Sequence, residues 1–130
     1  MINSRLIADL SLHGKIWFSR FAEALGKQLN LYRGIDWEVC CTRRDQEYQD
    51  QLYEQGRTTP GKIVTWTRDS RHLSGEAWDI FLLKDGKAVW ESPLYGQIAE
   101  VGRSLGLEAG YFWPKKKLDP GHFQTPQITE

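Results

Sequence analysis

Hydrophobic side chains recur at two different spacings along the chain, and the spacing separates the predicted helices from the predicted strands. Apolar residues at every fourth position predict an amphipathic helix over about 15–30, with a stripe made of Trp17, Phe21, Leu25 and Leu29. A second helix in the last third of the chain is predicted by a stripe at Leu94, Ile98, Val101 and Leu105. Both stripes are expected to face the hydrophobic core.

A shorter helix is predicted between these two. Asp45 is a residue type that caps helix N-termini. In the helix that follows, three large side chains are expected to face inward, namely Tyr48, Leu52 and Tyr53. Gly56 is expected to end this helix, and the turn residues of 57–61 predict a loop after it.

Alternation of apolar and polar residues predicts the strands. Residues 36–42 alternate, and the side chains on one side of this strand are Trp37, Val39 and Cys41. Residues 76–83 and 88–90 are predicted to form a β-hairpin, because Asp85 and Gly86 between them make a strong turn signal.

The remaining segments are shorter. Extended pieces are expected at 63–66, at 106–110 and from His122 onward, and the tail from about Thr125 is expected to be frayed. A chain of 130 residues fits one compact domain. The order of the elements predicts a single α+β domain over 1–130, with helices packed on a small, mostly antiparallel sheet.

Charge and hydropathy narrow the classes of function. Seventeen basic and seventeen acidic residues cancel, so the basic excess typical of a nucleic-acid-binding protein is missing. The basic run Lys115–Lys117 is either a solvated loop or a patch that steers an anionic polymer towards a site. Residues 1–9 lack the features of a signal peptide, and no apolar run approaches the roughly 20 residues that cross a bilayer. We expect a monomer made in the cytoplasm without stable membrane association.

The two cysteines predict no disulfide framework. Cys40 and Cys41 are adjacent, and their spacing does not match a zinc ribbon. Buried free thiols are the preferred interpretation, which suits folding in a reducing cytosol.

Two short segments carry the side chains that predict chemistry. His72 and Asp79 lie in one of them, and His122 lies in the other, three residues after Asp119. Catalytic zinc commonly takes three protein ligands and leaves a position for water. Gly75 and Pro120 disfavour a helix in both segments, so the ligands would come from a loop and two strands. His13 is expected to be a packed or surface residue.

The position of Asp79 in its predicted strand adds to this hypothesis. Trp78 and Ile80 fall on one face, and Asp79 falls with Phe81 and Leu83 on the other. An aspartate among apolar neighbours is costly unless a cation or hydrogen-bond donors compensate it. A metal ion would supply that compensation, whereas an exposed strand face or an arginine partner would remove the need for one.

The two segments resemble a known family. The pattern Ser-x-His-x-x-Gly-x-Ala-x-Asp is matched from Ser70 to Asp79, and the pattern Asp-x-x-His-Phe from Asp119 to Phe123. These are motifs of the zinc D-Ala-D-Ala carboxypeptidase and L-alanyl-D-glutamate endopeptidase family, which cuts bacterial peptidoglycan and includes many phage endolysins. Further similar segments lie in order between the first helix and about Gln124, including Gln49, Gln55-Gly56-Arg57, Pro60 to Thr65 and Gly106-Leu107.

The resemblance implies the role of each residue. It makes His72, Asp79 and His122 the ligands of one Zn²⁺ and Asp119 the catalytic carboxylate. Asp119 would accept a proton from the attacking water and return one to the departing amine.

Two further residues match polar positions of the family. Arg44 matches an arginine that would stabilise the oxyanion or hold a substrate carboxylate, unless it forms only a surface salt bridge. Its neighbours depart from the family, because Arg43 replaces a common aromatic residue and Asp45 a common serine. Ser70 matches a position next to the substrate, and it is equally suited to a turn.

The resemblance implies a peptidoglycan endopeptidase that cuts the L-Ala-D-Glu bond of the stem peptide, as a phage or prophage endolysin that reaches the wall after a holin opens the membrane. A D-Ala-D-Ala carboxypeptidase is the enzyme alternative. A non-catalytic peptidoglycan-binding module with a structural zinc is the alternative from another class, and Asp119 argues against it, because a structural site does not need this carboxylate.

Overall fold

The computed structural model describes residues 1–127. The elements follow one another in the order α1 (Leu12–Leu29), β1 (Ile35–Cys41), α2 (Gln46–Glu54), β2 (Ala77–Lys84), β3 (Lys87–Val89), α3 (Leu94–Leu105), β4 (Glu108–Ala109) and β5 (His122–Gln124). Short 3₁₀ turns lie at Ile7–Asp9, Arg71–Ser74, Gly110–Phe112 and Lys115–Lys117. This α+β arrangement confirms the predicted fold class.

The sheet is antiparallel in all its described pairings and is centred on β2. Its order is β1-β2-β5-β4, and β3 pairs with the other end of β2. The predicted hairpin is confirmed, because Asp85 and Gly86 both have positive φ (50° and 82°), as a type I′ turn requires. Because β5 lies between β2 and β4, the last described strand completes the interior of the sheet.

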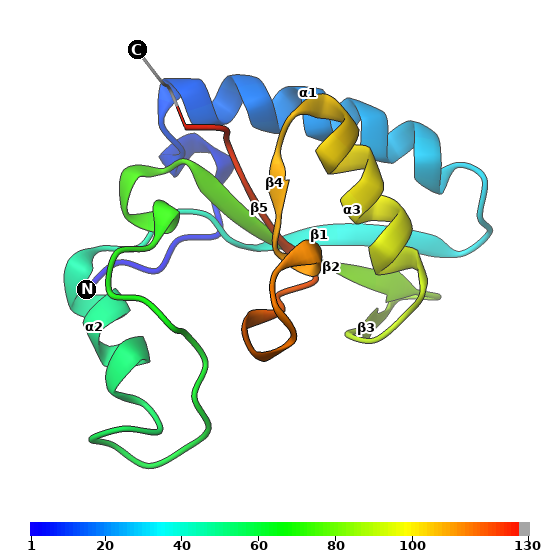
Figure 1. Cartoon of the computed structure of the whole chain (residues 1–130). Coiled ribbons are helices and arrows are strands. Elements are labelled where there is room, and N and C mark those ends of the chain that lie inside the picture. Colours follow the sequence, from blue (N-terminus) through cyan, green and yellow to red (C-terminus); the bar gives the residue numbers. More distant parts are fainter. Residues whose placement is uncertain (128–130) are drawn as a thin grey trace.

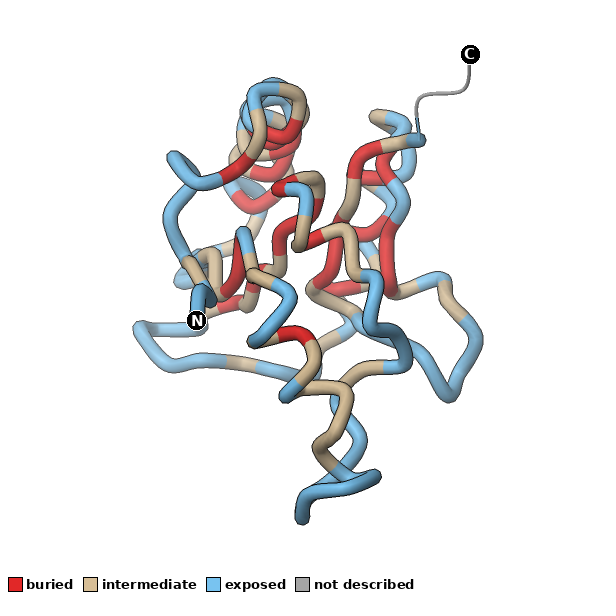
Figure 2. Tube along the Cα trace, turned by 90° about the vertical axis from the view of Figure 1, so that its left-hand side faces the viewer, coloured by how far each residue is buried: buried red, intermediate tan, exposed pale blue. Residues whose placement is uncertain are grey.

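Helices α1 and α3 cover one face of the sheet, and α2 lies with its following loop on the other side (Figure 1). The predicted stripe of α1 packs against the sheet, where Phe21 meets Phe123 with ring centroids 4.5 Å apart. Trp78 is fully buried beneath Phe18, 5.2 Å away. Buried positions concentrate where these helices meet the sheet (Figure 2). The core therefore occupies one face of β2 and leaves the face of Asp79 for other contacts.

The ends of the two predicted long helices lie close to the expected positions. Helix α1 begins three residues early, because the Ser11 hydroxyl accepts a hydrogen bond from the Gly14 N–H and caps it. Helix α3 ends before Gly106, which adopts a left-handed conformation with φ 105°.

The orientation predicted for α2 is wrong. Asp45 caps this helix as expected, through its carboxylate and the Tyr48 N–H at 2.9 Å. The side chain that α2 buries is polar Gln49, which is 0% exposed, whereas Tyr48, Leu52 and Tyr53 are half-buried. The reason is that Gln49 finds hydrogen-bond partners inside, which an apolar pattern does not reveal.

Three shorter segments also differ from the predictions. Residues 63–66 form no strand, and His72 lies in a 3₁₀ turn where a non-helical loop was expected. Thr125 is buried and anchored, since its N–H donates to the Glu76 carbonyl at 2.9 Å. The frayed tail was predicted from about residue 125, and residues 128–130 lie outside the described part of the chain.

Candidate metal centre

Three of the predicted site residues meet on the face of the sheet that the helices leave free. In the antiparallel pairing of β2 and β5, Trp78 lies opposite Phe123 on the core side, and Asp79 lies opposite His122 on the other side. His72 reaches the same place from the 3₁₀ turn that precedes β2. The rings of His72 and His122 lie 5.1 Å apart.

Both histidines direct a nitrogen at the carboxylate of Asp79. The Nδ1 atom of His122 lies 2.8 Å from Oδ1, and the Nε2 atom of His72 lies 3.2 Å from Oδ2. His72 is 1% exposed and His122 is 5% exposed. The site is thus largely shielded from solvent on the side of the two rings.

Partners behind the rings determine which nitrogen faces the carboxylate. The Nδ1–H of His72 donates to the Thr42 carbonyl at 2.6 Å, and the Nε2–H of His122 donates to Oε1 of Gln124 at 2.8 Å. When each ring is neutral and carries only the proton used in these hydrogen bonds, the lone pairs of Nε2 of His72 and Nδ1 of His122 point at Asp79. The Nε2 atom of His72 is buried and makes no hydrogen bond within residues 1–127.

This arrangement fits a metal ion. Two lone pairs and a carboxylate facing one another repel unless a proton or a metal cation lies between them. In the metal-free protein Nδ1 of His122 can carry that proton and donate it to Oδ1 of Asp79 at 2.8 Å, and a metal ion would replace it. Two imidazoles and one carboxylate form a donor set that zinc accepts, and in each ring the second nitrogen is held by a hydrogen bond, as is usual for metal ligands.

Cys41 is a further possible ligand that the sequence reasoning missed. Its ligand atom and those of His72 and Asp79 lie within 4.8 Å of one another, as do those of Asp79, Asp119 and His122. However, Cys41 Sγ lies 3.7 Å from Nδ1 of His72, the nitrogen already bonded to Thr42. Burial raises the pKa of Cys41 to about 12, so its thiol stays protonated. Both cysteines are free, as predicted, but only Cys41 is buried, and Cys40 is half-buried.

The charges of the site shift the pKa values of its acids and bases. Burial alone would raise the pKa of Asp79, but His72 and His122 outweigh it and hold that pKa well below its usual range. Burial alone would lower the pKa of His122, whereas the hydrogen bond and the charge of Asp79 raise it. Asp119 has a raised pKa, because its carboxyl is desolvated and lies near negatively charged Asp79.

Asp119 lies in the loop before β5. The backbone of this loop approaches the backbone at Gly110 closely. The N–H of Asp119 donates to the carbonyl of Gly110 at 3.0 Å. A Cβ atom on Gly110 would lie 2.4 Å from the Asp119 carbonyl oxygen, so this approach requires glycine. The residue as a whole is exposed, but its carboxyl group lies within metal-ligand range of Asp79 and His122, and their crowding accounts for its desolvation. The predicted catalytic carboxylate is therefore beside the predicted ligands.

Of the two neighbouring arginines, Arg44 faces the site and Arg43 is exposed. The Nη2 atom of Arg44 lies 3.5 Å from Oδ2 of Asp79, and its side chain is only 16% exposed, which rules out a purely superficial salt bridge. Its Nη1 donates to Oε1 of Gln49 at 3.2 Å. The Gln49 amide in turn donates to the Thr67 carbonyl at 2.7 Å.

Ser70 lies at the start of the turn that carries His72. Its hydroxyl accepts a hydrogen bond from the His72 N–H at 3.2 Å and caps the 3₁₀ turn. Ser70 therefore has the turn role that was one of its two expected roles. His13 packs as expected for a residue outside the site, with Nδ1 2.7 Å from Glu76 and Nε2 accepting from Trp17 at 3.1 Å.

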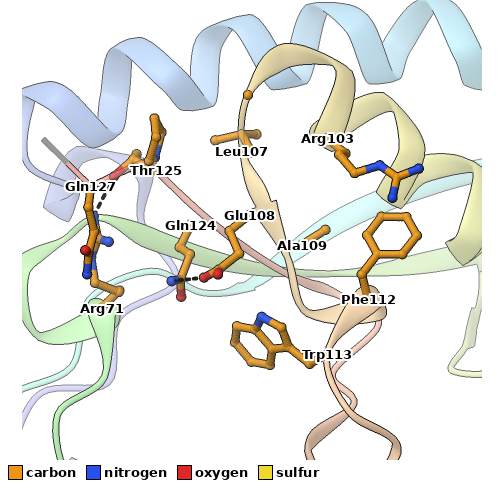
Figure 3. A pocket seen from close by; sticks show the side chains of 12 residues that line it. Arg71, Arg103, Leu107, Glu108, Ala109, Phe112, Trp113, Gln124, Thr125 and Gln127 are labelled. Carbon is orange, nitrogen blue, oxygen red and sulfur yellow. Dashed lines mark hydrogen bonds between the residues drawn. The ribbon is translucent and has the colours of Figure 1, made fainter. Parts of the chain in front are cut away.

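A cavity of about 620 Å³ lies beside the site on the side of β4 and β5 (Figure 3). Gln124 and Trp113 line it, and the Trp113 ring also lies 4.9 Å from that of His122. Arg71 and Arg103 add positive charge to its wall. The sequence reasoning missed Gln124, although strand alternation places it on the same side of β5 as His122.

A solved structure with a similar fold is known. The structure of the L-Ala D-Glu endopeptidase ChiX of Serratia marcescens superposes with a TM-score of 0.60 at 24% identity, over 90% of this chain and 89% of that one. The chain therefore has the fold of that endopeptidase, and no family model matches its sequence.

A curated relative is closer in sequence. The peptidoglycan L-alanyl-D-glutamate endopeptidase CwlK of Bacillus subtilis (strain 168) is 36% identical in an alignment of length 100 that covers 68% of this chain and 60% of that protein. With the fold, this similarity confirms the resemblance in the motifs: the chain belongs to the D-Ala-D-Ala carboxypeptidase and L-alanyl-D-glutamate endopeptidase family. It spans about three fifths of the length of the curated relative.

Proposed function

We propose that this protein is a zinc-dependent peptidoglycan endopeptidase that hydrolyses the L-Ala-D-Glu bond of the stem peptide. The observation that carries the proposal is the convergence of one ring nitrogen from each of His72 and His122 on the carboxylate of Asp79, with the carboxylate of Asp119 in reach. The activity that the names of CwlK and ChiX state supports the choice of bond.

His72, Asp79 and His122 would hold the ion, in an α+β domain that spans the described chain. A zinc ion bound there acts as a Lewis acid that polarises an amide carbonyl and makes a water molecule more acidic. The hydrogen bonds from His72 to Thr42 and from His122 to Gln124 keep both rings in the orientation that binding needs.

Asp119 acts as general base and then as general acid in this proposal. Its carboxylate takes a proton from the attacking water and gives one to the departing amine. Arg44 offers its guanidinium N–H groups to an anionic oxygen of the substrate, either the developing oxyanion or a carboxylate.

The proposed biological role is that of a phage or prophage endolysin, with peptidoglycan as its partner. In the part of the chain that the structure describes, no helix is long and apolar enough to cross a membrane. The protein would be made in the host cytoplasm, would work as a monomer and would reach the wall after holin-type release.

Mass spectrometry of purified Gram-negative peptidoglycan, incubated with the zinc-loaded protein and with a chelated control, tests the proposal. New D-Glu amino termini that are absent after chelation are the expected result. Release of only the terminal D-Ala would replace the proposal with a carboxypeptidase. An unchanged polymer that retains the protein would point to a binding module.

A further inference from the structure

Gln124 and Glu108 form a hydrogen-bonded pair directly behind one of the proposed ligands. On β5, Gln124 follows His122 by two residues, so both side chains lie on the same side of the strand. Oε1 of Gln124 accepts the Nε2–H of His122 at 2.8 Å. On the neighbouring strand β4, Glu108 is the direct register partner of Gln124.

Glu108 determines which end of the amide faces His122. Its carboxylate can only accept hydrogen bonds, so the Gln124 NH₂ group turns towards it, and Oε2 of Glu108 accepts from Nε2 of Gln124. Figure 3 shows this contact at the wall of the cavity. The carbonyl end of the amide is thereby left for the imidazole.

The orientation of the amide matters because it selects the tautomer of His122. An amide turned the other way would present NH₂ to Nε2 and would favour the tautomer with a proton on Nδ1. That proton would face Asp79, and Nδ1 would no longer have a lone pair for an ion. His122 is 5% exposed, so little solvent reaches the ring to replace the missing acceptor.

We infer that Gln124 and Glu108 are positioning residues for metal binding, which hold His122 in the tautomer whose Nδ1 can ligate. This inference rests on the proposed function, since it assumes that His122 holds the ion. The pair acts only through His122, so it should affect the affinity for zinc more than the stability of the metal-free fold.

The test measures zinc affinity of purified variants by competition with a chromophoric chelator. Gln124→Leu removes the acceptor and should weaken zinc binding about 10- to 100-fold. Gln124→Glu places two carboxylates opposite each other and should also weaken binding. The double variant Q124E/E108Q exchanges the two groups, keeps both hydrogen bonds and should return the affinity to near the wild-type value.

Two controls separate positioning from a general structural effect. Gln51→Leu changes an exposed glutamine of α2 and should leave zinc affinity unchanged. Thermal unfolding of the metal-free variants should differ little from wild type, whereas the visible absorption spectrum of the Co²⁺-substituted protein should change in Q124L and recover in the double variant.

The outcomes distinguish this inference from the proposed function. Wild-type zinc affinity in Q124L, or a double variant as weak as Q124L, would overturn the inference and leave the proposed function standing. If the wild-type protein binds zinc with an affinity that depends on this pair but releases no peptide, the proposed function fails and the inference stands. A wild-type protein without zinc affinity would overturn both.

Discussion

Gln49 is the buried side chain through which the fold holds Arg44 against the site, and replacing it with leucine should destabilise the protein. Its amide is 0% exposed and lies between the Arg44 guanidinium, at 3.2 Å, and the Thr67 carbonyl, at 2.7 Å. Leucine has a similar size and no polar atom, so the change removes both hydrogen bonds without leaving a large cavity.

The cost follows from these two contacts. A hydrogen bond to a charged group contributes about 1.5–3 kcal/mol and a neutral one about 0.5–1.5 kcal/mol. Burial of the leucine side chain returns roughly 1 kcal/mol or more, which leaves a net loss of about 2 kcal/mol. For a domain of this size that loss lowers the midpoint of thermal unfolding by roughly 8 °C. In this variant Arg44 loses its hydrogen bond to Gln49. Its Nε already lacks a hydrogen-bond partner within residues 1–127.

Thermal unfolding of Gln49→Leu beside Gln51→Leu, an exposed position on the same helix, measures the effect. The control should stay within about 0.5 kcal/mol of wild type. Steady-state kinetics on peptidoglycan fragments should also show a lower kcat/KM for Q49L, because Arg44 is less well held. Equal unfolding midpoints for the two variants would refute the reasoning that the buried amide holds this part of the fold together.

Three further predictions concern the site. Asp119→Asn should keep zinc and lose about 10²- to 10⁴-fold in turnover. Measurements of metal content and kcat test this, and a variant that retains turnover would show that Asp119 is not the general base. Chelation should lower the unfolding temperature of the wild type, since zinc at 100 times its Kd adds about 2.7 kcal/mol, whereas His72→Ala should show no such difference. In the metal-free protein, the raised pKa of His122 contributes stability that is fully present below its unfolded value of about 6.5 and is lost as the pH rises through the folded value. Unfolding temperatures between pH 6 and 9 should therefore fall more steeply for the wild type than for His122→Gln, and parallel curves would contradict this.

The regular elements could be predicted from the sequence where one face is apolar. The alternation around Asp79 predicted both the strand and the face on which this carboxylate lies, because Trp78 and Ile80 define the core side. The same logic failed for α2, since the residue that is buried there is a glutamine, whose partners come from distant segments.

The candidate site could be predicted only in part. The motifs named His72 and His122, and the structure brings both to Asp79. Spacing along the chain did not reveal Gln124 or the carbonyl of Thr42, because such outer contacts depend on strand pairing and on backbone atoms that carry no sequence signal. These contacts favour the neutral tautomers that suit a metal ion.

The place of β5 inside the sheet has a consequence for synthesis on the ribosome. A nascent chain that ends before residue 122 has β1 and β2 but lacks the strand between β2 and β4, and Phe21 and Trp78 have no Phe123 to pack with. Contacts this distant in sequence form late. The candidate metal site would therefore be completed only after His122 has emerged from the ribosome, and the proposed hydrolysis could not begin before then.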